Sequence, residues 1–175
     1  VVTNTAAAMG ALTWMTISWA QRGRPSVIGA AAGAVAGLVA ITPAAGFVTA
    51  SSAILIGLGA GVFCYLAVQL KNRLGFDDSL DVVGVHGVGG IWGALATGIF
   101  ATKLVNEAGA DGLLFGNPAQ LGIQFVAVLA TVVFATVATF IVLKVVDLVV
   151  GLRVPEEEER AGLDATQHGE LAYQL

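Results

Sequence analysis

Charged side chains are scarce in this sequence. Asp, Glu, Lys and Arg make up 11% of its 175 residues, whereas 57% of the residues are hydrophobic and the mean hydropathy is +0.85. Because a soluble domain carries about 25% charged residues, this composition excludes an ordinary soluble domain. The charges also cluster, with long uncharged stretches between the clusters, which is typical of a polytopic helical membrane protein.

Cysteine and basic residues are also few. Cys64 is the only cysteine, so a disulfide within the chain and a cysteine-based metal site are excluded. Lys and Arg number 8 against 12 Asp and Glu, and the net charge of -4 comes largely from the acidic C-terminal tail, which holds Glu156–Glu159. This balance indicates no nucleic-acid partner. We expect no metal and no cofactor.

A start signal is missing as well. The first residue is Val1, which already lies inside a hydrophobic segment, and no Met, basic region or cleavage site stands before it. We therefore expect this chain to be an N-terminally truncated fragment of a longer protein.

The uncharged stretches predict an all-α polytopic membrane protein. A transmembrane helix needs about 20 mostly apolar residues. On that measure residues 1–152 form a helical bundle and residues 153–175 form a polar tail. The five predicted spans cover about residues 1–20, 26–41, 51–70, 80–101 and 118–152. The second span stops at Thr42-Pro43, where proline removes a backbone donor.

The basic residues predict how the bundle is oriented. If every span crosses the membrane, five basic residues near the predicted loops fall on one side, and only Lys103 falls on the other. The five are Arg22, Arg24, Lys71, Arg73 and Arg153. Positive residues gather on the cytoplasmic side, so we expect the C-terminus to be cytoplasmic.

Glycines recur every four residues in three of the spans. They are Gly29, Gly33 and Gly37 in the second span, Gly57 and Gly61 in the third, and Gly89 and Gly93 in the fourth. Lipid offers little hydrophobic drive for helices to associate, so small residues that let backbones approach supply the packing. This spacing predicts a dense bundle and does not identify a substrate.

His86 stands in an otherwise apolar, glycine-rich segment. An ionisable residue inside a membrane is a functional candidate, because it is costly unless it has partners or lines a cavity. With Asp81 as the N-cap, helical spacing places Val82 and His86 on one face. Gly89 or Gly90, Gly93 and Thr97 continue that face. The residues alone leave two interpretations open: a histidine beside a pore, or one hydrogen-bonded in the packing.

The acids before His86 are also open to two interpretations. Asp78 is expected at the start of the helix, where a carboxylate favours the positive end of the dipole. Asp81 either caps the helix or contributes to a cytoplasmic vestibule. A membrane enzyme with His86 as general base is disfavoured, because only Asp81 stands within helical reach as a second group.

The chain resembles the Amt branch of the Amt/Mep/Rh ammonium transporter family along its whole length. "DDSLDVVGVHGVGGIWGALATGIFA" resembles the tenth transmembrane helix of that family. "NTAAAMGALTWM" with "RGRPS" is similar to the seventh helix, and "GAVAGLVAITPAAGFV" to the eighth. "VVGLRVPEEEERAGLDATQHGELAY" is similar to the end of the eleventh helix and the tail.

This resemblance implies an eleven-helix, usually trimeric fold in the plasma or inner membrane, with one pathway per subunit. The chain would supply helices 7–11. His86 would be the second member of a twin-histidine pair whose first member is absent from these spans. Val82 and Val35 would be apolar pore-wall residues. Ala32 departs from the family pattern, where a small hydroxyl is common before "GAVAG".

The function implied is ammonium transport, in which NH4+ loses a proton and NH3 passes through a narrow apolar pore lined by His86. The alternative is an ammonium sensor that signals through its tail to a PII-type partner. Within the tail, Pro155 suits a first helical turn, the run Glu156–Glu159 suits its dipole, and Gly162 can end it. That charge run is either a solvated face or a contact that couples subunits and partners.

Overall fold

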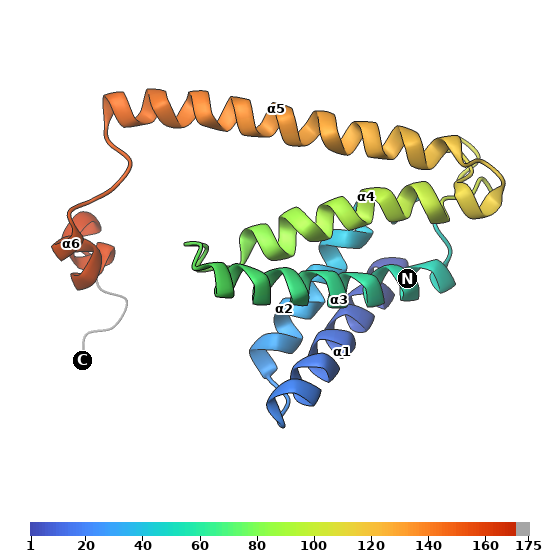
Figure 1. The fold of residues 1–175 in the computed structure, drawn as a ribbon, viewed down its shortest axis with the longest axis horizontal. Helices are drawn as coiled ribbons and strands as arrows, with labels where there is room; N and C mark the ends of the chain where they lie inside the picture. The colour runs from blue at the N-terminus through green and yellow to red at the C-terminus, as the bar shows by residue number, and fades with distance from the viewer. Residues whose placement is uncertain (171–175) are drawn as a thin grey trace. The chain divides into compact units, whose positions relative to one another are not determined.

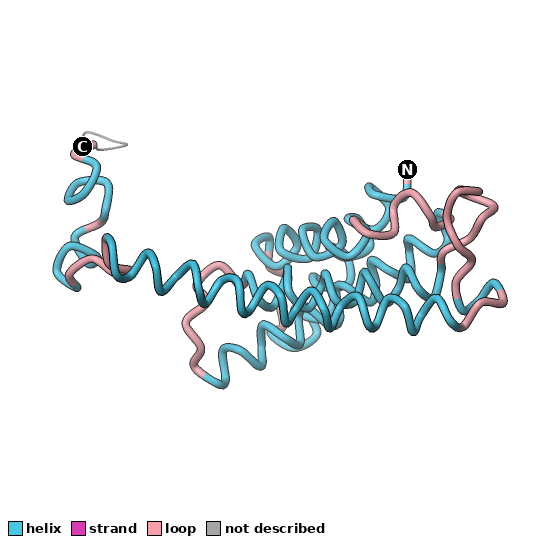
Figure 2. The backbone as a smooth tube through the Cα atoms, turned by 90° about the horizontal axis from the view of Figure 1, so that it is seen from above, coloured by secondary structure: helices cyan, strands magenta, loops and turns pink. Residues whose placement is uncertain are grey.

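The computed structural model describes residues 1–170 and, within that range, contains helices and loops but no β-strand (Figure 2). The chain forms two compact units, Val1–Leu129 and Ala130–Leu175. The main helices are α1 (Val2–Arg22), α2 (Val27–Ile41), α3 (Ala50–Leu74), α4 (Val88–Phe100), α5 (Ala119–Val149) and α6 (Glu156–Ala161). Shorter turns are the π-helical η1 (Val83–Gly87), the 3-10 helix η2 (Leu113–Phe115) and the π-helical η3 (Asp164–His168).

Backbone-to-backbone contacts at glycines hold α1, α2 and α3 together. A β-carbon on Gly37 would lie 2.2 Å from the carbonyl oxygen of Ala6, and one on Gly57 would lie 2.4 Å from the same oxygen. A β-carbon on Gly33 would lie 2.5 Å from the carbonyl oxygen of Gly10. No side chain fits at these distances, so the predicted close packing through small residues is confirmed.

The helix η1–α4 packs on α2 and α3 in the same way. A β-carbon on Gly93 would lie 2.2 Å from the carbonyl oxygen of Ala40 on α2. On the α3 side, the Trp92 indole N–H donates to the carbonyl oxygen of Ile56 at 2.9 Å. Its ring covers Gly59, whose β-carbon would lie 2.5 Å from it. In Figure 1 α3 and α4 run side by side.

These contacts fix the direction of each helix. Ala6 on α1 meets Gly37 near the end of α2, so α1 and α2 run antiparallel, whereas the Ala6–Gly57 contact makes α1 and α3 parallel. The Trp92–Ile56 bond and the η1 contacts with the end of α3 make α3 and α4 antiparallel. The ends of α1 and α3 and the starts of α2 and η1 therefore gather at one end of the first unit.

The basic residues follow that arrangement. Arg22 ends α1, and Lys71 and Arg73 lie in the last turn of α3. Lys103 follows α4 at the opposite end, where its backbone N–H donates to Asp111. The alternation of charge expected from the loops is therefore present in the first unit.

Three helical stretches in the described part of the chain are long and apolar enough to cross a membrane: Ala50–Leu74, Val83–Phe100 and Ala119–Val149. They correspond to the third, fourth and fifth predicted spans. α2 has 15 residues and is shorter than a full crossing, and α1 has 21 residues but is less apolar. Crossing by these two stays a prediction.

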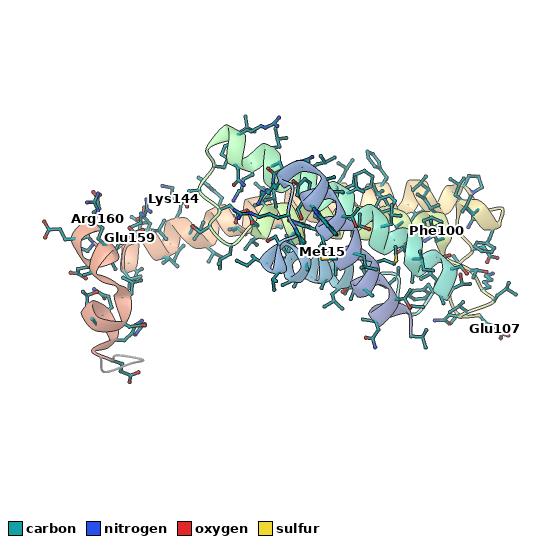
Figure 3. The ribbon with its side chains drawn as sticks, turned by 90° about the horizontal axis from the view of Figure 1, so that it is seen from below. Met15, Phe100, Glu107, Lys144, Glu159 and Arg160 are labelled. Carbon is teal, nitrogen blue, oxygen red and sulfur yellow. The ribbon has the colours of Figure 1, made fainter. Side chains whose placement is uncertain are left out.

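The tail in the second unit begins a short helix where the sequence indicates one. Backbone N–H groups of Glu158 and Glu159 donate to the carbonyl oxygen of Pro155, and α6 ends at Gly162. Arg160 pairs with Glu156 at 2.6 Å, and Figure 3 shows Glu159 beside Arg160 on this helix. Such exposed ion pairs contribute little stability.

Candidate functional site

His86 lies in η1, a single π-helical turn at the start of α4, and its side chain is exposed. The wide turn is marked by the backbone N–H of Val88, which reaches back to the carbonyl oxygen of Val83. π-helical turns carry an extra residue and occur often at functional sites. The direction of the His86 side chain is therefore set by a π-helical turn and not by a regular α-helix.

Because of the extra residue, the side chains that helical spacing places on one face lie on two different sides of the helix. Val82 is 49% exposed and His86 is exposed, but Gly93 and Thr97 are buried. One added residue turns the rest of the helix by about 100°, so the prediction of one continuous face is wrong. Gly90 borders open space, with nothing within 4 Å of a β-carbon there.

Gly89 belongs to the buried side of the same helix. A β-carbon on it would lie 3.2 Å from the Cys64 sulfur and 3.3 Å from the Val39 side chain. Of the two glycines considered for the face that carries His86, only Gly90 borders open space. The open side of η1–α4 combines an imidazole with a glycine that adds no bulk.

Val35 lies on α2, which runs parallel to α4. Val39 meets Gly89, and Val35 lies one turn before Val39 just as His86 lies about one turn before Gly89. The two predicted pore residues therefore occupy similar levels along the bundle. Val35 is 40% exposed, so both side chains are on surfaces that the described residues leave uncovered.

Asp78 lies at the start of the helix as expected, whereas Asp81 is not the cap. The Asp78 carboxylate accepts hydrogen bonds from the backbone N–H groups of Val82 at 2.9 Å and Val83 at 3.0 Å, so Asp78 caps the helix. The expectation that Asp81 is the N-cap is wrong. Asp81 instead has a positive φ of 56° and its carboxylate accepts from the Lys71 ammonium at 2.6 Å.

Two cavities adjoin these acids. One of about 160 Å³ is bordered by Asp81 together with Arg22, Ser26 and Asn72. The other, of about 450 Å³, is bordered by Asp78 together with Lys71 and apolar side chains such as Phe76. Both open at the end of the first unit that holds the basic residues. A vestibule role for either acid stays a prediction.

Sequence reasoning missed two features. It treated Lys71 only as a loop charge, although this side chain is 14% exposed and holds the segment before η1. It also missed the π-helical turn, for which the only signal is the run of glycines around His86. Within residues 1–170, no three His, Cys, Asp or Glu side chains gather closely enough to hold a metal ion.

Comparison with known proteins adds a family match. The model of the Ammonium Transporter Family matches residues 1–173. The ammonium transporter of Bacillus subtilis is 53% identical over 173 residues, which are 98% of this chain and 43% of that protein. Ammonium transporter Amt1 of Archaeoglobus fulgidus is 51% identical over 173 residues, covering 99% of this chain and 44% of that one.

Solved structures agree. The crystal structure of Mep2 from Saccharomyces cerevisiae has a TM-score of 0.84 at 42% identity, over 95% of this chain and 39% of that one. A structure described as a sensor Amt protein has a TM-score of 0.82 at 32% identity, over 95% of this chain and 40% of that one. The chain thus spans less than half the length of the relatives it matches.

Proposed function

The chain belongs to the Ammonium Transporter Family, and from this premise we propose that it forms one wall of a pathway that carries ammonium across the membrane. It is a multi-pass membrane protein with several apolar helices. In the proposed pathway NH4+ gives up a proton to water at the entrance, NH3 passes His86, Val82 and Val35, and NH3 takes a proton from water on the far side.

The observation that carries this proposal is the exposed imidazole of His86 within the apolar stretch Val83–Phe100. Such a group is costly against lipid and is tolerated beside a cavity or a protein partner. Relatives have more than half of their length outside the matched segment. We propose that a segment of this kind covers the open side of η1–α4 and leaves a narrow path over His86 and Gly90.

The chemistry of such a path favours ammonia over potassium. Moving a bare ion into an apolar medium costs on the order of 20 kcal/mol by idealised Born estimates. Neutral NH3 avoids most of this cost, and potassium has no proton to leave behind. A neutral imidazole donates a hydrogen bond from one nitrogen and accepts on the other, so His86 can hold NH3 in the path without adding a fixed charge.

The expected location and partners rest on the same premise. We place the protein in the plasma or inner membrane, with Arg22, Lys71 and the tail on the cytoplasmic side, because basic residues gather there. A homotrimer is the proposed assembly. The run Glu156–Glu159 on α6 is exposed, and we propose that the tail contacts neighbouring subunits or a PII-type signal protein.

A second candidate function is ammonium sensing. The similarity to the sensor Amt protein favours keeping it. In that function the membrane segment binds ammonium and the tail passes the signal to a partner, with little net transport. The two functions differ in flux, which is measurable.

The test is His86→Ala in the full-length gene product, reconstituted in liposomes. We expect ammonium uptake to fall by about 100-fold, because loss of a positioned group can cost that much, or potassium to enter. His168→Ala is the matched control, because His168 is exposed in η3. Unchanged uptake and selectivity in His86→Ala would refute the pathway. Negligible flux in the unmodified protein, with ammonium binding intact, would favour the sensor.

A further inference from the structure

Lys71 ties the end of α3 to the segment that leads into η1. Its ammonium group donates to the Asp81 carboxylate at 2.6 Å and to the carbonyl oxygen of Asp78 at 2.6 Å. The Lys71 side chain is 14% exposed and the Asp81 side chain is 34% exposed. Charge-assisted hydrogen bonds of this length are stronger than neutral ones, and partial burial limits screening by salt.

Both acceptors of Lys71 belong to residues that define the start of the helix. Asp78 caps the helix through the N–H groups of Val82 and Val83. The carbonyl oxygen of Asp81 accepts from the N–H of Val85 at 2.8 Å, which lies inside η1. A shift of either acceptor would therefore move the turn that contains His86.

Asp81 has an uncommon backbone conformation for a residue other than glycine. It is the only non-glycine residue with a positive φ among the described residues. Such a backbone conformation costs of order 1 kcal/mol or more in a non-glycine residue, although aspartate tolerates it better than most, and persists only where surrounding contacts enforce it. The Lys71 ammonium is the contact that reaches its side chain.

One face of α3 supports η1 over two turns. The Cys64 thiol lies 3.7 Å from the carbonyl oxygen of Val85, and the Val68 side chain lies where a β-carbon on Gly84 would be, at 2.7 Å. Lys71 continues this face at the spacing of a helix. The Cys64 thiol donates a weak hydrogen bond to the Val85 carbonyl oxygen, and Val68 supplies apolar packing. Lys71 supplies the charged contact in this row.

We propose that Lys71 is a positioning residue for His86: through Asp81 and Asp78 it fixes the start of η1 and so the side of the helix on which the imidazole lies. This inference rests on the proposed function, since it gives Lys71 a role in selectivity through His86. A simple ion pair would stabilise the fold and leave selectivity unchanged.

The experiment compares Lys71→Met and Lys71→Arg in the full-length gene product, reconstituted at equal amounts of folded protein. Methionine keeps the apolar stem and removes the donors. Because a misplacement of about 1 Å in a positioned group can cost about 100-fold, we expect Lys71→Met to lower ammonium transport by about 10- to 100-fold. We also expect the ammonium-to-potassium selectivity to fall. Lys71→Arg keeps donors for both acceptors and should restore most of the rate and the selectivity.

Arg73→Met is the matched control. It removes the same charge from the same last turn of α3, at an exposed position that the Lys71 contacts do not use. We expect its transport and selectivity to match those of the unmodified protein. Equal losses in Arg73→Met and Lys71→Met would indicate a general charge effect and overturn the inference.

A second comparison tests the route through Asp81. Residues that act as a unit give non-additive losses, so Lys71→Met combined with Asp81→Asn should transport about as well as Lys71→Met alone. Multiplied losses would overturn this route. If Lys71→Met has full activity while His86→Ala has none, the positioning role fails and the pathway stands. If His86→Ala has full activity, the pathway itself fails.

Discussion

The contact between Gly93 and Ala40 sets how closely α4 approaches α2, and Gly93→Ala perturbs it by one carbon atom. The added β-carbon would lie 2.2 Å from the Ala40 carbonyl oxygen and 2.8 Å from the Ala40 α-carbon. Ordinary contact begins at 3.4 Å, so the two backbones must separate by about 1 Å along this seam.

The expected loss follows from that displacement. Overpacking a well-packed interior costs typically about 1–3 kcal/mol, and the obstructing atoms here are backbone, which cannot change rotamer. Alanine regains about 1 kcal/mol of helix propensity over glycine. We therefore expect Gly93→Ala to lower the free energy of unfolding by about 1–2 kcal/mol, taking the upper part of the overpacking range.

The measurement is unfolding of the purified full-length gene product in SDS, followed by tryptophan fluorescence. Gly122→Ala is the control, because Gly122 lies in α5 with nothing within 4 Å of a β-carbon. It carries the same chemical change without the clash and should be neutral or slightly stabilising. If Gly93→Ala is as stable as Gly122→Ala, α4 does not pack on α2 as described.

Two further predictions concern the helix cap and the tail. Asp78→Ala removes the acceptor for the Val82 and Val83 N–H groups and should lower the free energy of unfolding by about 1–2 kcal/mol. The Val82 and Val83 N–H groups bond to separate oxygens of Asp78, and asparagine keeps only one acceptor oxygen. Asp78→Asn, measured by the same unfolding assay, should therefore recover only part of the loss; equal losses in both variants would mean that the cap is not the source. Truncation after Val154 should leave ammonium selectivity intact but abolish the response to a PII-type protein, measured as transport with and without that partner. Unchanged regulation would leave Glu156–Glu159 as a solvated surface.

The helices could be predicted because their signals are local. Uncharged stretches between charge clusters gave the three long apolar helices within a few residues, and the glycine spacing at Gly33, Gly37 and Gly93 gave the close packing. Composition and spacing were sufficient to predict these helices, because a helix in lipid must satisfy all its backbone hydrogen bonds within itself.

The geometry around His86 could not be predicted because it depends on contacts between distant segments. The π-helical turn contacts α3 through Val68 at Gly84, and the segment before it contacts α3 through Lys71 at Asp81. Helical spacing alone assumes a regular turn and therefore placed Gly93 on the same helix face as the imidazole. The residue type favoured Asp81 as the cap, whereas Asp78, three residues earlier, accepts from the Val82 and Val83 N–H groups.

The parallel pairing of α2 with α4 has a consequence for assembly in the bilayer. Because α1 and α2 are neighbours in the sequence, they can pack together as soon as both have been made. Ala40 on α2 meets Gly93 only after α3 and α4 have also been made. In water such a delay would expose an apolar surface to aggregation. Acyl chains solvate the waiting surface of α2 at little cost, so the contact between α4 and α2 can form last.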